Sequence, residues 1–122
     1  MTIKLTESQE DYLEAIYSIE RTGKSAGVTV IASNLKVRKP SVTAAMKLLV
    51  KKGLVLHGNY GDVILTTIGR KYASEVALRH EALRDLFVNK LGLPEKVADR
   101  NACRMEHALE PDVLTKLIKI LN

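Results

Sequence analysis

Apolar side chains recur at steps of three and four residues through most of this chain, which is the spacing that places them on one face of an α-helix. The first such segment follows Thr6 and Gln9, which stand at the spacing of a capping box. Leu13 and Ile16 continue its apolar face. We therefore predict a helix that begins near Glu7 and ends before the glycines that follow.

Two more helical segments, residues 28–35 and 40–52, follow each other across a brief basic turn. Pro40 suits the first turn of the second helix, and Gly53 suits its C-terminal end. The leading end of this helix is small, hydroxylated and basic, as in a helix-turn-helix, where such side chains reach phosphates and base edges. The residues expected to contact DNA are Arg38, Lys39, Pro40, Ser41, Thr43 and Lys47.

Two short β-prone runs, Leu54–His57 and Asp62–Thr66, flank a turn rich in glycine and asparagine. This pattern predicts a hairpin, and a hairpin directly after a helix-turn-helix is a wing. Wings lie along phosphates, so His57, Asn59 and Tyr60 are candidates for DNA contact. The alternative is that they are ordinary turn residues.

The second half of the chain predicts three further helices. Thr67 can cap a long helix to about Leu91, another begins at Pro94, and a last one follows the break at Glu110–Asp112. The apolar stripe of the middle helix is expected to hold Ala98, Ala102, Met105 and Leu109. We expect a mainly α fold with an N-terminal winged helix-turn-helix domain over residues 1–73, with a two-stranded wing, and a helical dimerisation domain over residues 74–122. So much helical apolar surface after the wing favours a homodimer.

The amino-acid composition of the chain indicates which kinds of binding partner to expect. The 122 residues include 19 Lys and Arg against 14 Asp and Glu, a net charge of +5 that suits a nucleic-acid partner. Aromatic residues make up 4%, which argues against a stacking platform for single strands. A single cysteine excludes an internal disulfide and suits a reducing cytoplasm. No apolar run is long enough to span a membrane, so we expect no membrane partner. We also expect no small organic substrate.

Potential metal ligands stand together near the C-terminus. Cys103, Glu106 and His107 occupy positions i, i+3 and i+4, which share one side of a helix. Thiolate, carboxylate and imidazole all bind first-row divalent ions. The alternative is a buried cysteine beside a solvated Glu/His pair.

Three other polar residues have ordinary explanations when taken alone. Asp11 and Glu14 stand at i, i+3 on the first predicted helix, as on any solvated acidic face. His80 lies on or beside the apolar stripe of the long helix, where a structural, hydrogen-bonded histidine is usual.

Taken in order, these parts resemble the diphtheria-toxin-repressor family (DtxR/MntR type). The segments that carry the resemblance are Glu10–Tyr17, Pro40–Thr43, Leu65–Arg70, Arg79–His80 and Ala102–His107. The resemblance implies a metal-activated, homodimeric, winged-helix repressor. It also implies a set of metal ligands: Asp11, Glu14, His80, Cys103, Glu106 and His107.

The ligand set combines two branches of that family. An acidic residue at position 11 resembles the manganese-responsive branch, whereas Cys103 resembles the iron-responsive branch. The iron branch has a second metal position, whose Glu and His places are held here by Arg84 and Asp99, which argues against a second site. Since a thiolate favours softer ions than Mn(II), we expect Fe(II) first and Mn(II) next, with Zn(II) or Co(II) able to substitute.

The function expected is therefore repression of metal-homeostasis genes through palindromic double-stranded operator DNA. A cation bridging the two halves of each protomer would set the gap between paired recognition helices. One rival is a winged-helix regulator that does not sense metal. The other is a metalloenzyme, but the sequence holds no second catalytic motif, so we expect no enzymatic activity.

Overall fold

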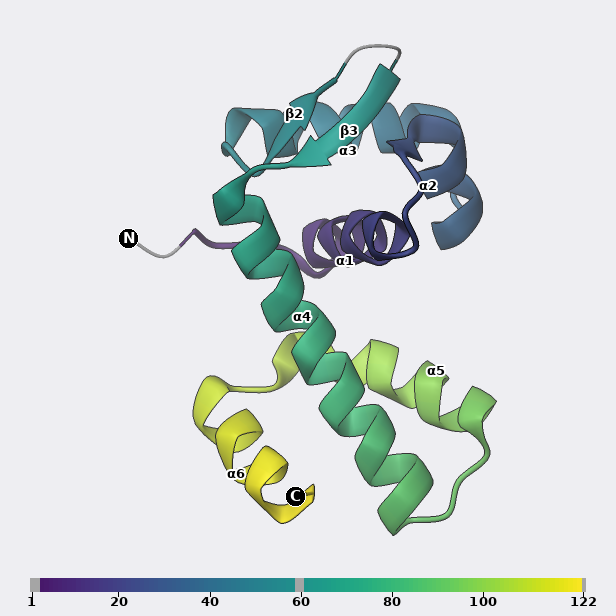
Figure 1. The fold of residues 1–122 in the computed structure, drawn as a ribbon, viewed down its shortest axis with the longest axis vertical. Coiled ribbons are helices and arrows are strands. Elements are labelled where there is room, and N and C mark those ends of the chain that lie inside the picture. The colour runs from purple at the N-terminus through teal and green to yellow at the C-terminus, as the bar shows by residue number, and fades with distance from the viewer. Residues whose placement is uncertain (1–2, 59–60, 122) are drawn as a thin grey trace. The chain divides into compact units, whose positions relative to one another are not determined.

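A computed structural model describes residues 3–58 and 61–121 of the chain (Figure 1). The chain divides into two compact units, one ending at Ser74 and the other beginning at Glu75. Helix α4 (Thr67–Asp85) contributes residues to both units. Among the described residues, no helix combines the length and the apolar character that crossing a membrane requires.

The N-terminal unit contains the predicted helix-turn-helix. Its elements are α1 (Glu7–Arg21), β1 (Ala26–Gly27), α2 (Val28–Leu35), α3 (Lys39–Lys51), β2 (Val55–His57) and β3 (Asp62–Leu65). The capping box that begins α1 is confirmed, since the Gln9 amide donates to the Thr6 hydroxyl and the Thr6 amide donates to the Gln9 side chain, each at 3.1 Å. Helix α2 ends in a left-handed residue, Lys36, with φ of 57°. This conformation reverses the chain and allows α3 to begin at Lys39, one residue earlier than predicted.

The core of this unit is apolar and draws on every one of these elements. The spacing of apolar residues in α3 predicts Val42, Ala45, Met46 and Leu49 as its inward stripe. Val42, Met46 and Leu49 are fully buried and Ala45 is partly buried, so the stripe is confirmed. They meet Leu13 and Ile16 of α1 in one cluster. The opposite face of α3 is left in solvent by the same helical spacing.

The wing is larger than the predicted two-stranded hairpin. Strands β2 and β3 pair as expected, with Leu56 opposite Ile64, but β1 adds a third antiparallel strand in the order β1–β3–β2. In β1, Ala26 pairs with Val63 and Gly27 pairs with Asp62. Two residues are too few to show an alternating pattern, so only the backbone pairing reveals this strand.

The start of α4 corrects a second expectation. Thr66, not Thr67, caps the helix, because its hydroxyl accepts the Gly69 amide at 3.0 Å and donates to the Gly53 carbonyl at 2.7 Å. A Cβ atom at Gly69 would lie 1.8 Å from the Leu54 carbonyl oxygen. A glycine is therefore required where α4 passes close to the backbone between α3 and β2.

The secondary structure of the C-terminal unit, where it is described, consists of helices and helical turns. After α4 come a π-helical segment η2 (Leu86–Lys90), α5 (Glu95–Met105), a 3-10 turn η3 (Glu106–Ala108) and α6 (Pro111–Leu121). The prediction that Met105 belongs to the buried stripe was wrong, because α5 ends there and its side chain is 48% exposed. The last helix begins at Pro111, two residues before the predicted Val113, since proline is well tolerated in a first helical turn.

Candidate metal centre

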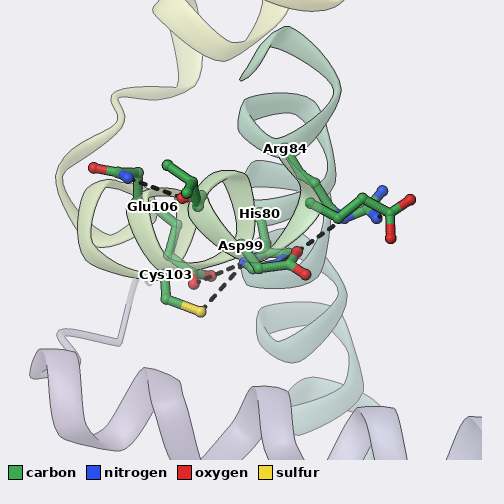
Figure 2. Close-up of polar contacts among 8 residues, drawn as sticks. His80, Arg84, Asp99, Cys103 and Glu106 are labelled. Atoms are coloured by element: carbon green, nitrogen blue, oxygen red, sulfur yellow. Dashed lines mark hydrogen bonds and ion pairs between the residues drawn. The ribbon is translucent and has the colours of Figure 1, made fainter. Parts of the chain in front are cut away.

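Three predicted ligands converge within the C-terminal unit. His80 comes from α4, Cys103 from the last turn of α5, and Glu106 from the start of η3. One ligand atom from each lies within 4.8 Å of the others, and Figure 2 shows the three side chains turned toward one another. The atoms offered are an imidazole nitrogen, a thiol sulfur and a carboxylate oxygen, which are the donor types that transition metals take in proteins.

The centre of this group is the carboxylate of Glu106. Its Oε1 lies 3.2 Å from Nδ1 of His80, and the Cys103 sulfur lies 3.8 Å from the same nitrogen. Glu106 is completely buried, and no other charged residue in the described part of the chain is buried as a whole. A charged group that is removed from water needs an opposite charge or several hydrogen bonds to offset the lost hydration.

The second oxygen of Glu106 lacks such compensation. Among the described residues, Oε2 is buried without a hydrogen-bond partner. An unsatisfied buried polar atom costs about 1–3 kcal/mol, and more when it is charged. Beside a thiol and an imidazole, an unpaired carboxylate oxygen is the arrangement expected of residues that bind a cation, so the donor set fits a divalent metal.

The local backbone explains why these side chains meet. Helix α5 ends at Met105, and the chain tightens into a 3-10 turn at Glu106. Glu106 follows Cys103 by three residues at the end of α5, and helical geometry places residues at i and i+3 on the same side. His80 reaches the same place from α4 because α4 and the adjoining η2 pack against α5 in the apolar cluster of Leu83, Phe87, Ala98 and Ala102.

The second ring nitrogen of His80 faces a different group. Nε2 lies 3.4 Å from Oδ1 of Asp99, and that oxygen also accepts from Nε of Arg84 at 2.9 Å (Figure 2). A terminal nitrogen of Arg84 is 3.4 Å from Glu95. The two residues that the sequence placed at a second metal position are therefore paired with each other. Sequence reasoning missed that Asp99 also contacts His80, although the spacing of Glu95 and Asp99 on one helix face was a usable signal.

The other three predicted ligands lie on η3 and on α1. His107 lies on η3 and is partly buried, but it is not part of the three-residue group within the described residues. Asp11 and Glu14 are partly buried on α1, in the N-terminal unit, at positions one helical turn apart. The part that these three residues take in binding an ion stays a prediction.

The predicted DNA contacts lie at the leading half of α3 and in the wing. The side chains that are exposed there are Arg38, Lys39, Pro40, Ser41, Thr43, Lys47 and, in the wing, His57. The Thr43 hydroxyl donates to the Lys39 carbonyl at 3.2 Å. Asn59 and Tyr60 lie outside the described residues. Exposure leaves the α3 side chains available to DNA, and their contacts remain a prediction.

Comparison with known families matches nearly the whole chain. Residues 4–63 match the model described as the iron dependent repressor, N-terminal DNA binding domain. Residues 66–122 match the iron dependent repressor, metal binding and dimerisation domain. The two models meet at the start of α4.

Curated relatives agree with these two matches. An HTH-type transcriptional regulator of Methanocaldococcus jannaschii is 34% identical over 93% of this chain and 91% of its own length. The iron-dependent repressor IdeR of Mycobacterium leprae is 34% identical over 97% of this chain and 51% of its own length. The regulator MntR of Shouchella clausii is 31% identical over 92% of this chain and 78% of its own length. The chain thus spans about half the length of the IdeR proteins that it resembles.

Solved structures show the same fold. The manganese regulator SloR superposes with a TM-score of 0.84 at 27% identity, over 97% of this chain and 55% of its own. A manganese-dependent transcriptional repressor in complex with manganese superposes with a TM-score of 0.85 at 26% identity, over 93% of this chain and 52% of its own. The expected winged helix-turn-helix followed by a helical domain is confirmed. The protein belongs to the family of metal-dependent transcriptional repressors that includes IdeR, the diphtheria toxin repressor and MntR, and this family consists of DNA-binding regulators, not enzymes.

Proposed function

We propose that the protein is a homodimeric repressor of metal-homeostasis genes, which binds a palindromic operator when a divalent ion, Fe(II) before Mn(II), is bound. The observation that carries this proposal is the buried Glu106. It has one oxygen beside His80 and Cys103 and another without a partner among the described residues.

The residues proposed to hold the ion come from both units. His80, Cys103 and Glu106 form the part already gathered in the C-terminal unit. His107 extends it from the same turn, and Asp11 and Glu14 contribute from α1. A bound divalent ion supplies the positive charge that clustered carboxylates and a thiolate need in order to lie close together.

The preference for Fe(II) follows from the donor set. Manganese prefers hard oxygen ligands, whereas the thiolate of Cys103 and the imidazole of His80 favour later and softer ions. The carboxylates of Glu106, Asp11 and Glu14 keep Mn(II) acceptable. Zn(II) or Co(II) can replace either ion in solution, because both accept sulfur, nitrogen and oxygen together.

The link to DNA depends on α1, which carries two proposed ligands and also packs beneath the recognition helix. Leu13 and Ile16 of α1 lie in the same core as Val42 and Met46 of α3. When Asp11 and Glu14 bind the same ion as the C-terminal unit, the ion acts on α3 as well, because α1 and α3 share one core. In a dimer this selects the spacing at which two recognition helices meet successive major grooves, about 34 Å apart or a multiple of it.

Within that arrangement, different side chains on the exposed face of α3 are proposed to contact different parts of the DNA. Arg38, Lys39 and Lys47 are proposed to hold phosphates, and Ser41 and Thr43 to meet base edges. Pro40 sets the start of the helix. Asn59 and Tyr60 are proposed to contact the phosphate backbone of the DNA.

The test is the isosteric change Glu106→Gln, with Glu110→Gln as control. Glu110 is exposed in the same unit, so the two variants lose the same charge in different surroundings. The operator is first selected from a random double-stranded library with the Mn(II)-loaded protein. Anaerobic titration with Fe(II) or Mn(II) is then followed by calorimetry and by fluorescence anisotropy of the selected DNA.

We expect the wild type and Glu110→Gln to bind the ion and to gain operator affinity from it. Glu106→Gln should keep its fold and its dimer but lose the gain. Operator affinity that is equal with and without metal in the wild type would favour the rival function, a winged-helix regulator that does not sense metal.

A further inference from the structure

The two nitrogens of the His80 ring face different kinds of group. Nδ1 is turned toward the ligand cluster, 3.2 Å from Oε1 of Glu106 and 3.8 Å from the sulfur of Cys103. Nε2 is turned away from it, 3.4 Å from Oδ1 of Asp99. A neutral imidazole carries its proton on one nitrogen and a lone pair on the other, so the group that holds the proton decides which nitrogen can bind a cation.

Asp99 is itself held in place by a cation. Arg84 donates through Nε to the same Oδ1 at 2.9 Å and approaches Glu95 at 3.4 Å (Figure 2). His80 and Arg84 are one turn apart on α4, and Glu95 and Asp99 are one turn apart on α5. An arginine keeps its charge at any ordinary pH, so Asp99 beside it is a carboxylate, which accepts hydrogen bonds and donates none.

We propose that Asp99, held by Arg84, is a positioning residue for the metal centre: it accepts the Nε2 proton of His80 and thereby leaves Nδ1 as the ligand nitrogen. This inference rests on the proposed function. A carboxylate on the distal nitrogen of a histidine ligand fixes the tautomer and the ring orientation and raises the basicity of the ligand. The Arg84–Asp99 pair thus acts on the ion only through His80.

Another role is available to the same residues. Asp99 and Arg84 join α4 to α5, and an ion pair between two helices could stabilise the fold without any effect on the histidine tautomer. Both side chains are partly exposed, 48% for Asp99 and 37% for Arg84, so the ion pair alone contributes little to stability. The test must therefore read out the tautomer and the affinity for the ion, not stability alone.

The probe is Zn(II), which is diamagnetic and suits imidazole and thiolate ligands. Long-range proton–nitrogen correlations of the histidine rings are recorded for the full chain, with and without Zn(II), and the His80 signals are identified by their loss in His80→Gln. We expect Nε2 to be protonated and Nδ1 to be the nitrogen bound by Zn(II). Zn(II) bound through Nε2, or two ions per subunit with Asp99 as a ligand, would overturn the inference.

The matched variants are Asp99→Ala and Asp112→Ala. Both remove one aspartate from the C-terminal unit, but Asp112 is exposed in the first turn of α6. Asp99→Ala should weaken Zn(II) binding by about 10–100-fold, whereas Asp112→Ala should leave it unchanged. Asp99→Asn keeps an acceptor oxygen without the charge, so we expect an intermediate loss.

The outcomes distinguish a failure of this inference from a failure of the proposed function on which it rests. If the wild type binds Zn(II) and Asp99→Ala binds it equally well, the positioning role is wrong and the proposed function stands. If the wild type binds none of Fe(II), Mn(II) and Zn(II), the proposed function fails and the inference fails with it.

Discussion

The core of the N-terminal unit and the core of the C-terminal unit differ in how much they bury. The first draws buried apolar side chains from three helices, three strands and the beginning of α4. The second, among the described residues, is a cluster of four buried side chains, Leu83, Phe87, Ala98 and Ala102, two of which are alanines. Val76 and Ala82 of the same unit are also buried. None of the residues of α6 is fully buried, and the one fully buried charge of the described chain, Glu106, lies in this unit.

This difference between the two cores suits the two units to different roles. A unit with a continuous apolar core keeps one shape by itself, which suits a surface that reads DNA. A unit that buries little and carries a buried carboxylate with one oxygen unpaired among the described residues depends on something added for its stability, which suits a sensor. On the proposed function, the additions are an ion at Glu106 and a second copy of the chain.

The largest effect on stability is expected from a substitution in the larger core, that of the N-terminal unit. Ile16 is fully buried in α1, so Ile16→Ala should lower the free energy of unfolding by about 2–5 kcal/mol, measured by urea denaturation. Ile68→Ala is the control, because Ile68 is 53% exposed in the first turn of α4, and it should change stability by no more than about 0.5 kcal/mol. A loss below 1 kcal/mol for Ile16→Ala would show that this core is not what holds the unit together.

Metal addition tests the same comparison at the C-terminal unit. With free Mn(II) at a hundred times its dissociation constant, mass action stabilises the native state by about 2.7 kcal/mol. Hydrogen exchange should place the gain in protection in α5, η3 and the adjoining part of α4, together with α1 if Asp11 and Glu14 bind. Glu106→Gln should abolish the gain. Protection that rises mainly in α2 and α3 would contradict the proposed division.

The smallest expected effect on a single chain is at the last helix. Ile120 is 69% exposed on α6, so Ile120→Glu should change the free energy of unfolding of the monomer by no more than about 0.5 kcal/mol. If α6 lies in the proposed dimer interface, the same change should shift the protein from dimer to monomer in sedimentation velocity. Thr115→Glu, at another exposed position of α6, tests whether the added charge alone has that effect.

Local interactions explain which parts of the fold could be predicted. Caps, proline positions and the period of apolar residues act over a few neighbours, so the bounds of α1 and α2 and the burial of Val42, Met46 and Leu49 followed from sequence. Strand β1 did not, because its two residues are ordered by pairing with β3, far along the chain. The cap at Thr66 depends likewise on the Gly53 carbonyl, which lies thirteen residues away.

The candidate site divides in the same way. The spacing of Cys103 and Glu106 on one helix side is local, so the chain alone pointed to them, and the resemblance to a family added His80. Glu106 is wholly buried, and one of its oxygens has no hydrogen-bond partner among the described residues. This burial, and the place of Asp99 between Arg84 and His80, depend on α4 packing against α5. The sequence by itself therefore determined the elements and the residue types able to bind a metal. Only the tertiary structure decided which donors meet and which nitrogen of His80 faces them, because burial and orientation arise from contacts between segments that are distant in the chain.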